Sequence, residues 1–174
     1  LDQYYAAAHH GGDPEDMDVV EWEWWETGVF RLVNGIWDRY DELSSFLSEN
    51  SLADDAAYAT FETFFDTDSF ATYFSAWFYG GGSDWYDNNI KFWRDRGDGG
   101  RWRWMLFDQD GFYSDYNANL LANSMWYSAP WLPINAVFAS EIFETRFINM
   151  VADYLNTYLH PERAVEVVDR MAAE

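Results

Sequence analysis

The sequence predicts an α+β fold that is mainly helical and carries one short β-hairpin. The chain has 174 residues, a length that suits one hydrophobic core, so we treat residues 1–174 as a single domain. Apolar residues recur at spacings of three and four through much of the chain, which indicates helices. Near the middle, two short aromatic runs flank a glycine-rich stretch, which indicates two strands joined by a turn.

Three helices are expected ahead of the hairpin, over residues 36–50, 54–65 and 69–79. Asp54 and Asp68 are expected to cap the second and the third, because an aspartate side chain accepts hydrogen bonds from the free N–H groups of a first turn. A run of three glycines then ends the third helix. The aromatic faces of these helices predict core contacts rather than a ligand site.

The remaining elements lie on either side of these helices. Residues 9–28 begin with glycine, proline and acids, which predicts a loop that leads into a short extended segment. The hairpin strands are expected over residues 90–94 and 102–107, joined by Arg96-Gly97-Asp98-Gly99-Gly100. Three further helices are expected near the end of the sequence, the last opening on a proline. They span residues 137–144, 145–159 and 161–173.

Charge and composition exclude several classes of function. Ten Lys and Arg residues against 31 Asp and Glu give a net charge of −21, which would repel a nucleic-acid backbone, so no nucleic-acid partner is expected. The lack of cysteine excludes disulfides, thiol catalysis and zinc thiolates. No apolar segment is long enough to predict a membrane span. The acidity fits either a high-salt habitat or cation binding, and composition alone does not separate them.

The stretch from Asp84 to Asp110 holds the candidate chemistry. Asn89 follows Asp84 at the spacing that separates the catalytic aspartate of protein kinases from a metal-binding asparagine. The second expected strand ends in Asp108 and Asp110, and strand alternation would place both carboxylates on the same side. Carboxylates that close repel each other unless a divalent cation lies beside them. Because the hairpin would return them to Asn89, the stretch predicts a magnesium-dependent phosphoryl-transfer site.

The same residues also allow other interpretations. Asp84 and Asp87 could be turn and cap residues, and the segment 108–111 could be a solvated turn. A calcium loop fits poorly, because Gly111 comes too early and Phe112 stands where an oxygen ligand is needed. The many tryptophans, tyrosines and carboxylates also fit a carbohydrate-binding or glycan-processing domain, since rings stack on sugars and paired acids cleave glycosidic bonds.

Several blocks, in the expected order, resemble the CotH family of atypical protein kinases, named after spore coat protein H. The similarity covers roughly residues 13–171, nearly the whole chain. Two of the later segments add to it, including one in which an Arg-Phe pair lies near the start of a helix. The matching pieces are Asp66-Thr67-Asp68-Ser69-Phe70, residues 83–94 with Asp84-Trp85-Tyr86-Asp87-Asn88-Asn89, residues 101–112 with Phe107-Asp108-Gln109-Asp110, Phe143-Glu144-Thr145-Arg146-Phe147, and Leu155-Asn156-Thr157-Tyr158.

The resemblance implies ATP-dependent phosphorylation of Ser or Thr in a protein substrate, by a secreted or coat-associated bacterial enzyme. The chain would be the C-lobe of an atypical protein-kinase-like fold, and its hairpin would carry the metal site. Asp84 would be the catalytic carboxylate, with ATP and Mg²⁺ as cofactors. Asn89, Asp108 and Asp110 would lie on the metal side. Second-tier candidates are Asn88, Lys91, Arg94 and Asp87.

The resemblance also implies parts that this sequence does not contain. In the family, the nucleotide-clamping lysine and its acidic partner lie in an N-terminal lobe, and no stretch here matches that lobe. We therefore expect the chain to belong to a longer protein that supplies it, with an extracellular or cell-surface location. A catalytically silent relative, kept as a structural coat or cell-surface module, is the other possibility. Against it, every acidic position expected in this lobe is filled.

Overall fold

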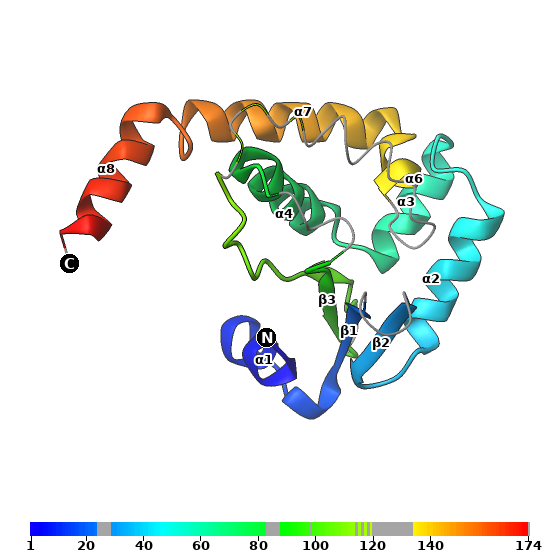
Figure 1. Cartoon of the computed structure of the whole chain (residues 1–174). Coiled ribbons are helices and arrows are strands. Elements are labelled where there is room, and N and C mark those ends of the chain that lie inside the picture. The colour runs from blue at the N-terminus through cyan, green and yellow to red at the C-terminus, as the bar shows by residue number, and fades with distance from the viewer. Residues whose placement is uncertain are drawn as a thin grey trace.

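The computed structural model describes residues 1–23, 29–82, 88–97, 99–113, 115, 117, 119 and 134–173. Helices carry most of this part of the chain, and one small sheet lies below α4 and α7 in the view of Figure 1. The elements, in order, are α1 (Gln3–His10), the 3-10 turn η1 (Pro14–Asp16), β1 (Met17–Glu23), β2 (Val29–Asn34), α2 (Asp38–Glu49), α3 (Asp55–Phe64), α4 (Thr67–Gly80), β3 (Lys91–Asp95), β4 (Arg103–Trp104), α6 (Ile134–Phe138), α7 (Glu141–Asn156) and α8 (Pro161–Ala172).

The sheet has four strands in the order β2-β1-β3-β4, and every pair is antiparallel. The predicted hairpin is confirmed as β3 and β4, which pair Phe92 with Trp104. The predicted extended segment is confirmed as β1. The expectation of a hairpin alone was wrong, because β1 pairs along β3 and β2 adds an outer strand. Strand β2 is only half-buried, so its sequence gave little indication of a strand.

The helices before the hairpin match the prediction except at one cap. Asp54 caps α3 as expected, and its side chain accepts from the N–H of Ala57 at 2.9 Å. Asp68 was expected to cap α4, but Asp66 is the N-cap, with its carboxylate accepting from the N–H of Ser69 at 3.1 Å. Asp68 lies inside the first turn. There its negative charge interacts favourably with the positive end of the helix dipole.

The C-terminal helices differ from the prediction in their boundaries. Helix α7 runs without a break through residues 144 and 145, where two helices had been expected to meet. Phe143 and Phe147 lie four residues apart on the same buried face, so the continuous helix keeps both in the core. Helix α8 begins at Pro161 as predicted. Helix α1 was not predicted, and it contains His9 and His10, which had been placed in a loop.

The core lies on both faces of the sheet, and aromatic side chains dominate its larger cluster. Alternation along β3 sends Phe92 to the larger cluster, which packs against α2, α3, α4 and α7. It sends Trp93 to a smaller cluster with Ala6 of α1. Figure 1 shows α7 crossing over α4, while α8 projects from the end of α7. In the described part of the chain, no helix has the length and apolar character needed to cross a membrane.

Candidate active site

The structure brings Asn89 and Asp108 together, as the hairpin prediction required. The side-chain amide of Asn89 donates through Nδ2 to the backbone carbonyl of Asp108 at 3.4 Å. The ladder of β3 and β4 positions both segments, and it continues past β4 because the N–H of Met105 donates to the carbonyl of Lys91 at 2.9 Å. Residues 19 positions apart in sequence therefore face each other across the open end of the hairpin.

Both of these residues have an unusual backbone conformation. The φ angle is 55° at Asn89 and 53° at Asp108, in the left-handed region that non-glycine residues seldom adopt. Asn and Asp tolerate it better than other L-residues, because their short polar side chains can bond locally. Each such residue costs of the order of 1–3 kcal/mol, and such residues cluster at functional sites. Two of them in direct contact mark this place as a candidate site.

The Asn89 side of the pair is buried and fixed to the body of the protein. Its backbone carbonyl accepts a hydrogen bond from the hydroxyl of Tyr73, on α4, at 3.3 Å. The next carbonyl, that of Ile90, accepts from the N–H of Trp22, on β1, at 2.9 Å. Successive carbonyls ahead of β3 are thus held by a helix and by a strand. The loop enters β3 with its geometry set from both sides.

The Asp108 side of the pair is an exposed turn rather than a strand end. The second strand had been expected to run to residue 107, but pairing in β4 ends at Trp104. Strand alternation therefore does not place Asp108 and Asp110 on the same side. Asp108 has a left-handed backbone, and residues 109–112 form a turn. The N–H of Phe112 closes this turn by donating to the carbonyl of Gln109 at 3.0 Å. The solvated-turn geometry considered for this segment is what the structure shows, and both carboxylates face solvent.

Glycines at the end of α4 let this acidic turn pack closely. A Cβ atom on Gly80 would lie 2.2 Å from Cδ2 of Phe112, and one on Gly82 would lie 2.3 Å from the ring of Trp77. The N–H of Tyr113 also donates to the carbonyl of Gly80. The glycine run therefore does more than end the helix. It gives the residues that follow Asp110 a surface on which to dock.

The donor set fits a hard cation such as Mg²⁺ in chemistry. Asn89, Asp108 and Asp110 offer amide and carboxylate oxygens, which are the ligands Mg²⁺ takes. In the described residues, no three histidine or acidic side chains gather closely enough to hold a metal ion alone. Mg²⁺ in phosphoryl-transfer sites is usually held by one or two carboxylates together with substrate phosphates and water. The exposed Asp108 and Asp110 suit that kind of site.

Two of the predicted site residues, Asp84 and Asp87, lie outside the described residues. Asn88 is described, half-buried and next to Asn89. Lys91 lies two residues further on and is buried, with its Nζ atom 3.0 Å from Oε1 of Glu21 on β1. The structure therefore places Lys91 near the loop but gives it an acidic partner on the neighbouring strand.

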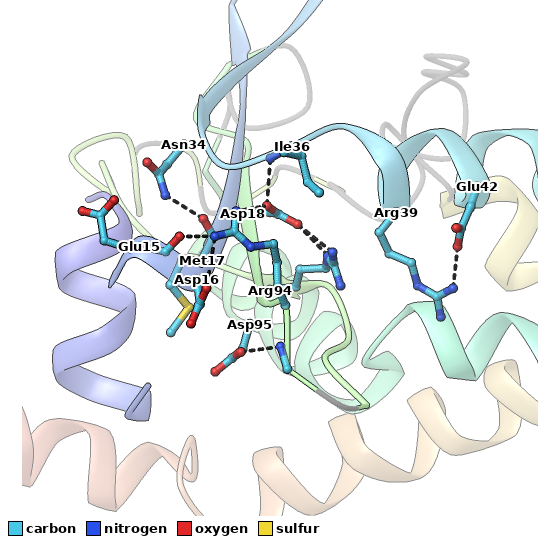
Figure 2. A network of polar contacts seen from close by, with 12 residues as sticks. Glu15, Asp16, Met17, Asp18, Asn34, Ile36, Arg39, Glu42, Arg94 and Asp95 are labelled. Atoms are coloured by element: carbon cyan, nitrogen blue, oxygen red, sulfur yellow. Dashed lines mark hydrogen bonds and ion pairs between the residues drawn. The ribbon is translucent and has the colours of Figure 1, made fainter. Parts of the chain in front are cut away.

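Arg94 lies away from Asn89, at the other end of β3. Five residues of extended chain correspond to roughly 15 Å. Its Nε and Nη2 atoms each lie 2.8 Å from Oδ2 of Asp18, which is fully buried. Figure 2 shows the Asp18 carboxylate between this guanidinium and the N–H of Ile36, which donates to Oδ1 at 2.9 Å. The sequence did not single out Asp18, and this network stabilises the junction of β1, β3 and the segment before α2.

Asp66, the first residue of the first matching block, holds α4 against β4. Arg101 and Arg103 both contact its Oδ2 atom at 3.1 Å. Burial works to raise the pKa of this carboxyl, but the N–H of Ser69 and the two guanidinium groups outweigh it, so the pKa lies below its ordinary value. The block therefore has a structural basis: its first aspartate caps the helix that carries Tyr73 and joins it to the strand that leads to Asp108.

The Arg-Phe pair of α7 has a similar basis. Arg146 donates to Oε1 of Glu62 at 2.7 Å and to the hydroxyl oxygen of Thr67 at 2.9 Å, which joins α7 to the junction of α3 and α4. Phe147 is buried in the main core. Burial works to raise the pKa of Glu62, but hydrogen bonds from Thr67 and Arg146 outweigh it and the pKa is lowered. Both residues of the pair therefore hold α7 in place.

The fold and this site define a mainly helical α+β domain in which a hairpin brings a buried asparagine to an exposed acidic turn. The family model described as CotH kinase protein matches residues 4–174 of the chain. The chain therefore belongs to the CotH kinase family, as the sequence resemblance predicted, and this membership indicates a kinase-like function. Comparison with curated proteins and with solved structures gave no match.

Proposed function

We propose that this chain supplies the catalytic-loop and metal-binding half of an ATP- and Mg²⁺-dependent kinase that phosphorylates Ser or Thr in a protein substrate. The observation that carries the proposal is the contact between Asn89 and Asp108, both left-handed, in a chain of the CotH kinase family. A nucleotide-clamping lobe outside this chain would complete the ATP site. The protein would act outside the cell or at its surface.

In this proposal each residue has one task. Asp84 accepts the proton of the acceptor hydroxyl and orients its oxygen toward the phosphate. Asn89, Asp108 and Asp110 hold the Mg²⁺ ion, which neutralises phosphate charge when it is bound. The ladder of β3 and β4 keeps Asn89 facing the acidic turn. Asn88, Lys91, Arg94 and Asp87 remain second-tier candidates, of which Arg94 has the strongest structural role because of its bond to Asp18.

The glycan-binding alternative loses part of its support. It depended on exposed tryptophans and tyrosines. Each tryptophan in the described part of the chain is buried or half-buried, whereas Tyr4, Tyr113 and Tyr158 are exposed. Most of the aromatic content instead fills the core. A silent structural module keeps the same fold, so only a measurement of phosphate transfer separates it from an active kinase.

The test measures transfer of labelled phosphate from ATP to casein by the complete protein, in which the nucleotide-clamping lobe accompanies this chain. Mg²⁺ is present in this assay, and Mn²⁺ binding is followed alongside by its electron paramagnetic resonance signal. Asp108→Ala is expected to weaken Mn²⁺ binding roughly tenfold or more, since even partners of metal ligands change affinity that much. Asp84→Asn is expected to keep Mn²⁺ binding and to lower transfer roughly a hundredfold or more, which is the usual contribution of a general base.

Asp153→Ala is the matched control, because it removes one exposed carboxylate from α7, away from the hairpin. It is expected to change neither quantity. The proposal fails if Asp108→Ala and Asp84→Asn both match the parent chain in metal binding and transfer. Activity that is lost to the same extent in Asp153→Ala would indicate a general effect of charge rather than a site.

A further inference from the structure

We propose that Tyr73 is the positioning residue of this site, and that its hydroxyl holds Asn89 in the orientation that faces Asp108. The inference rests on the proposed function, because it assigns Asn89 to the metal side. The hydroxyl donates to the backbone carbonyl of Asn89 at 3.3 Å. The aromatic spacing of residues 69–79, which include Tyr73, predicts only core contacts.

The hydroxyl is the informative part of this side chain. Tyr73 lies on α4 with Phe70, Phe74 and Trp77, and a phenylalanine would fill the same volume among these rings. The oxygen is the only atom by which tyrosine differs from phenylalanine, and it is directed at the residue whose side chain contacts Asp108.

Asn89 needs such a donor because of its conformation. Its carbonyl is in a buried residue, and a buried carbonyl without a partner is costly. Asn89 precedes β3, and the next two carbonyls, those of Ile90 and Lys91, accept from Trp22 and Met105. The Tyr73 hydroxyl donates to the carbonyl just before these two, at a residue whose left-handed backbone is unfavourable.

The same ring also touches the other half of the site. The centroid of the Tyr73 ring lies 5.0 Å from that of Trp104, the last residue of β4. Three residues further along, the chain reaches Phe107 and then Asp108. Tyr73 therefore contacts Asn89 itself through its hydroxyl and the strand before Asp108 through its ring. A single side chain of a buried helix sets the spacing of both.

The test compares Tyr73→Phe with Tyr58→Phe in the full chain. Tyr58 is the matched control, since it is also buried and its hydroxyl also makes a hydrogen bond, to Oε1 of Glu62 at 3.2 Å, on α3. Three quantities are measured for each variant: the melting temperature, the Mn²⁺ dissociation constant, and the NMR signal of the Asn89 side-chain amide. The Mg²⁺ dependence of phosphate transfer is measured as well.

Tyr73→Phe is expected to weaken Mn²⁺ binding about two- to tenfold, the equivalent of one hydrogen bond. It should raise the Mg²⁺ concentration needed for half-maximal transfer by the same factor, with the rate at saturating Mg²⁺ within about twofold of the parent. The Asn89 amide signal should shift. Tyr58→Phe should lower the melting temperature and leave the metal constants and the Asn89 signal in place.

Two results would overturn the inference. One is a Tyr73→Phe variant whose Asn89 signal and Mn²⁺ constant match the parent, and the other is a Tyr58→Phe variant that changes both as much. Failure of the proposed function gives a different result: the complete protein would bind no Mn²⁺ and transfer no phosphate. In that case the Asn89 amide signal still decides whether the Tyr73 hydroxyl holds this residue, by shifting in Tyr73→Phe and not in Tyr58→Phe.

Discussion

Helices α4 and α8 have similar lengths, 14 and 12 residues, and opposite surroundings. Eight residues of α4 are buried, and its rings contact β4, α6 and α7. No residue of α8 is buried, and Figure 1 shows it projecting from the end of α7. The candidate site depends on α4, through Tyr73 and through the glycines that receive the acidic turn. The candidate site thus lies beside a buried helix rather than an exposed one.

Charge shows the same contrast. Around α4 and the sheet, arginines are bound to acids: Arg94 to Asp18, and Arg101 and Arg103 to Asp66. On α8, Arg163 and Arg170 form no ion pair with any acid in the described residues. In a chain with a net charge of −21, most cations are used to hold the site-bearing region together. Substitutions should therefore have large effects in one region and small ones in the other.

The largest effect is expected at Phe70, near the centre of this packing. Phe70 is fully buried on α4, and its ring lies 5.2 Å from that of Trp104 and 5.9 Å from that of Phe143. Phe70→Ala should lower the free energy of unfolding by about 3–5 kcal/mol, measured by urea denaturation, because it leaves a cavity between α4, β4 and α7.

Phe78→Ala is the control for this prediction. Phe78 is on the same helix and is only half-buried, so its removal creates less cavity and should cost less. Equal losses for the two variants would show that the ring of Phe70 has no special place, and the contrast between the two regions would lose its main support.

Sequence patterns predicted the interior of this dense region better than its connections. The 3.6-residue period located α2, α3 and α4, because apolar faces alone define a buried helix. The two-strand prediction missed β2, because this half-buried strand lacks a clear alternation of apolar and polar residues. The same prediction extended the second hairpin strand to residue 107, because the apolar residues up to Phe107 are typical of a strand, whereas β4 ends at Trp104. The left-handed turn at Asp108 depends on contacts with distant residues.

The candidate site divides in the same way. Spacing and order indicated that Asn89 and Asp108 would meet, because a hairpin fixes which residues return to each other. Tyr73 was recognised only as a core residue, since a pattern of apolar spacing does not show where a hydroxyl points. Asp18 was missed altogether, because its partner Arg94 lies 76 residues away and on another strand. Long-range polar pairs leave no local signal.

A smaller effect, dependent on pH, is expected at the Asp66 cluster. The folded-state pKa of Asp66 lies below its ordinary value, so its stabilisation is present above the unfolded pKa, near 4, and is lost as pH falls through the folded pKa. Asp66→Asn keeps a capping side chain but removes the charge that Arg101 and Arg103 contact. It should cost about 1–2 kcal/mol at pH 7, and the difference from the parent should shrink below about pH 4.

Urea denaturation between pH 3 and pH 7 measures this difference, and Asp54→Asn is the matched cap control. Asp54 caps α3 and contacts no arginine in the described residues. A loss at Asp66→Asn that persists unchanged at the lowest pH would mean that its charge is not what holds α4 to β4. Equal losses in the two variants would assign the effect to capping alone.

The smallest effect is expected on α8, at Val168, which is 63% exposed. Val168→Ala removes little buried surface, and alanine is the better helix former by up to about 0.7 kcal/mol, so the free energy of unfolding should stay within about 0.5 kcal/mol of the parent. Val20→Ala, the same change at a fully buried position of β1, should cost about 2 kcal/mol. If Val168→Ala instead cost as much as Val20→Ala, the apolar side of α8 would be covered in solution, and the contrast with α4 would not describe the protein as it exists there.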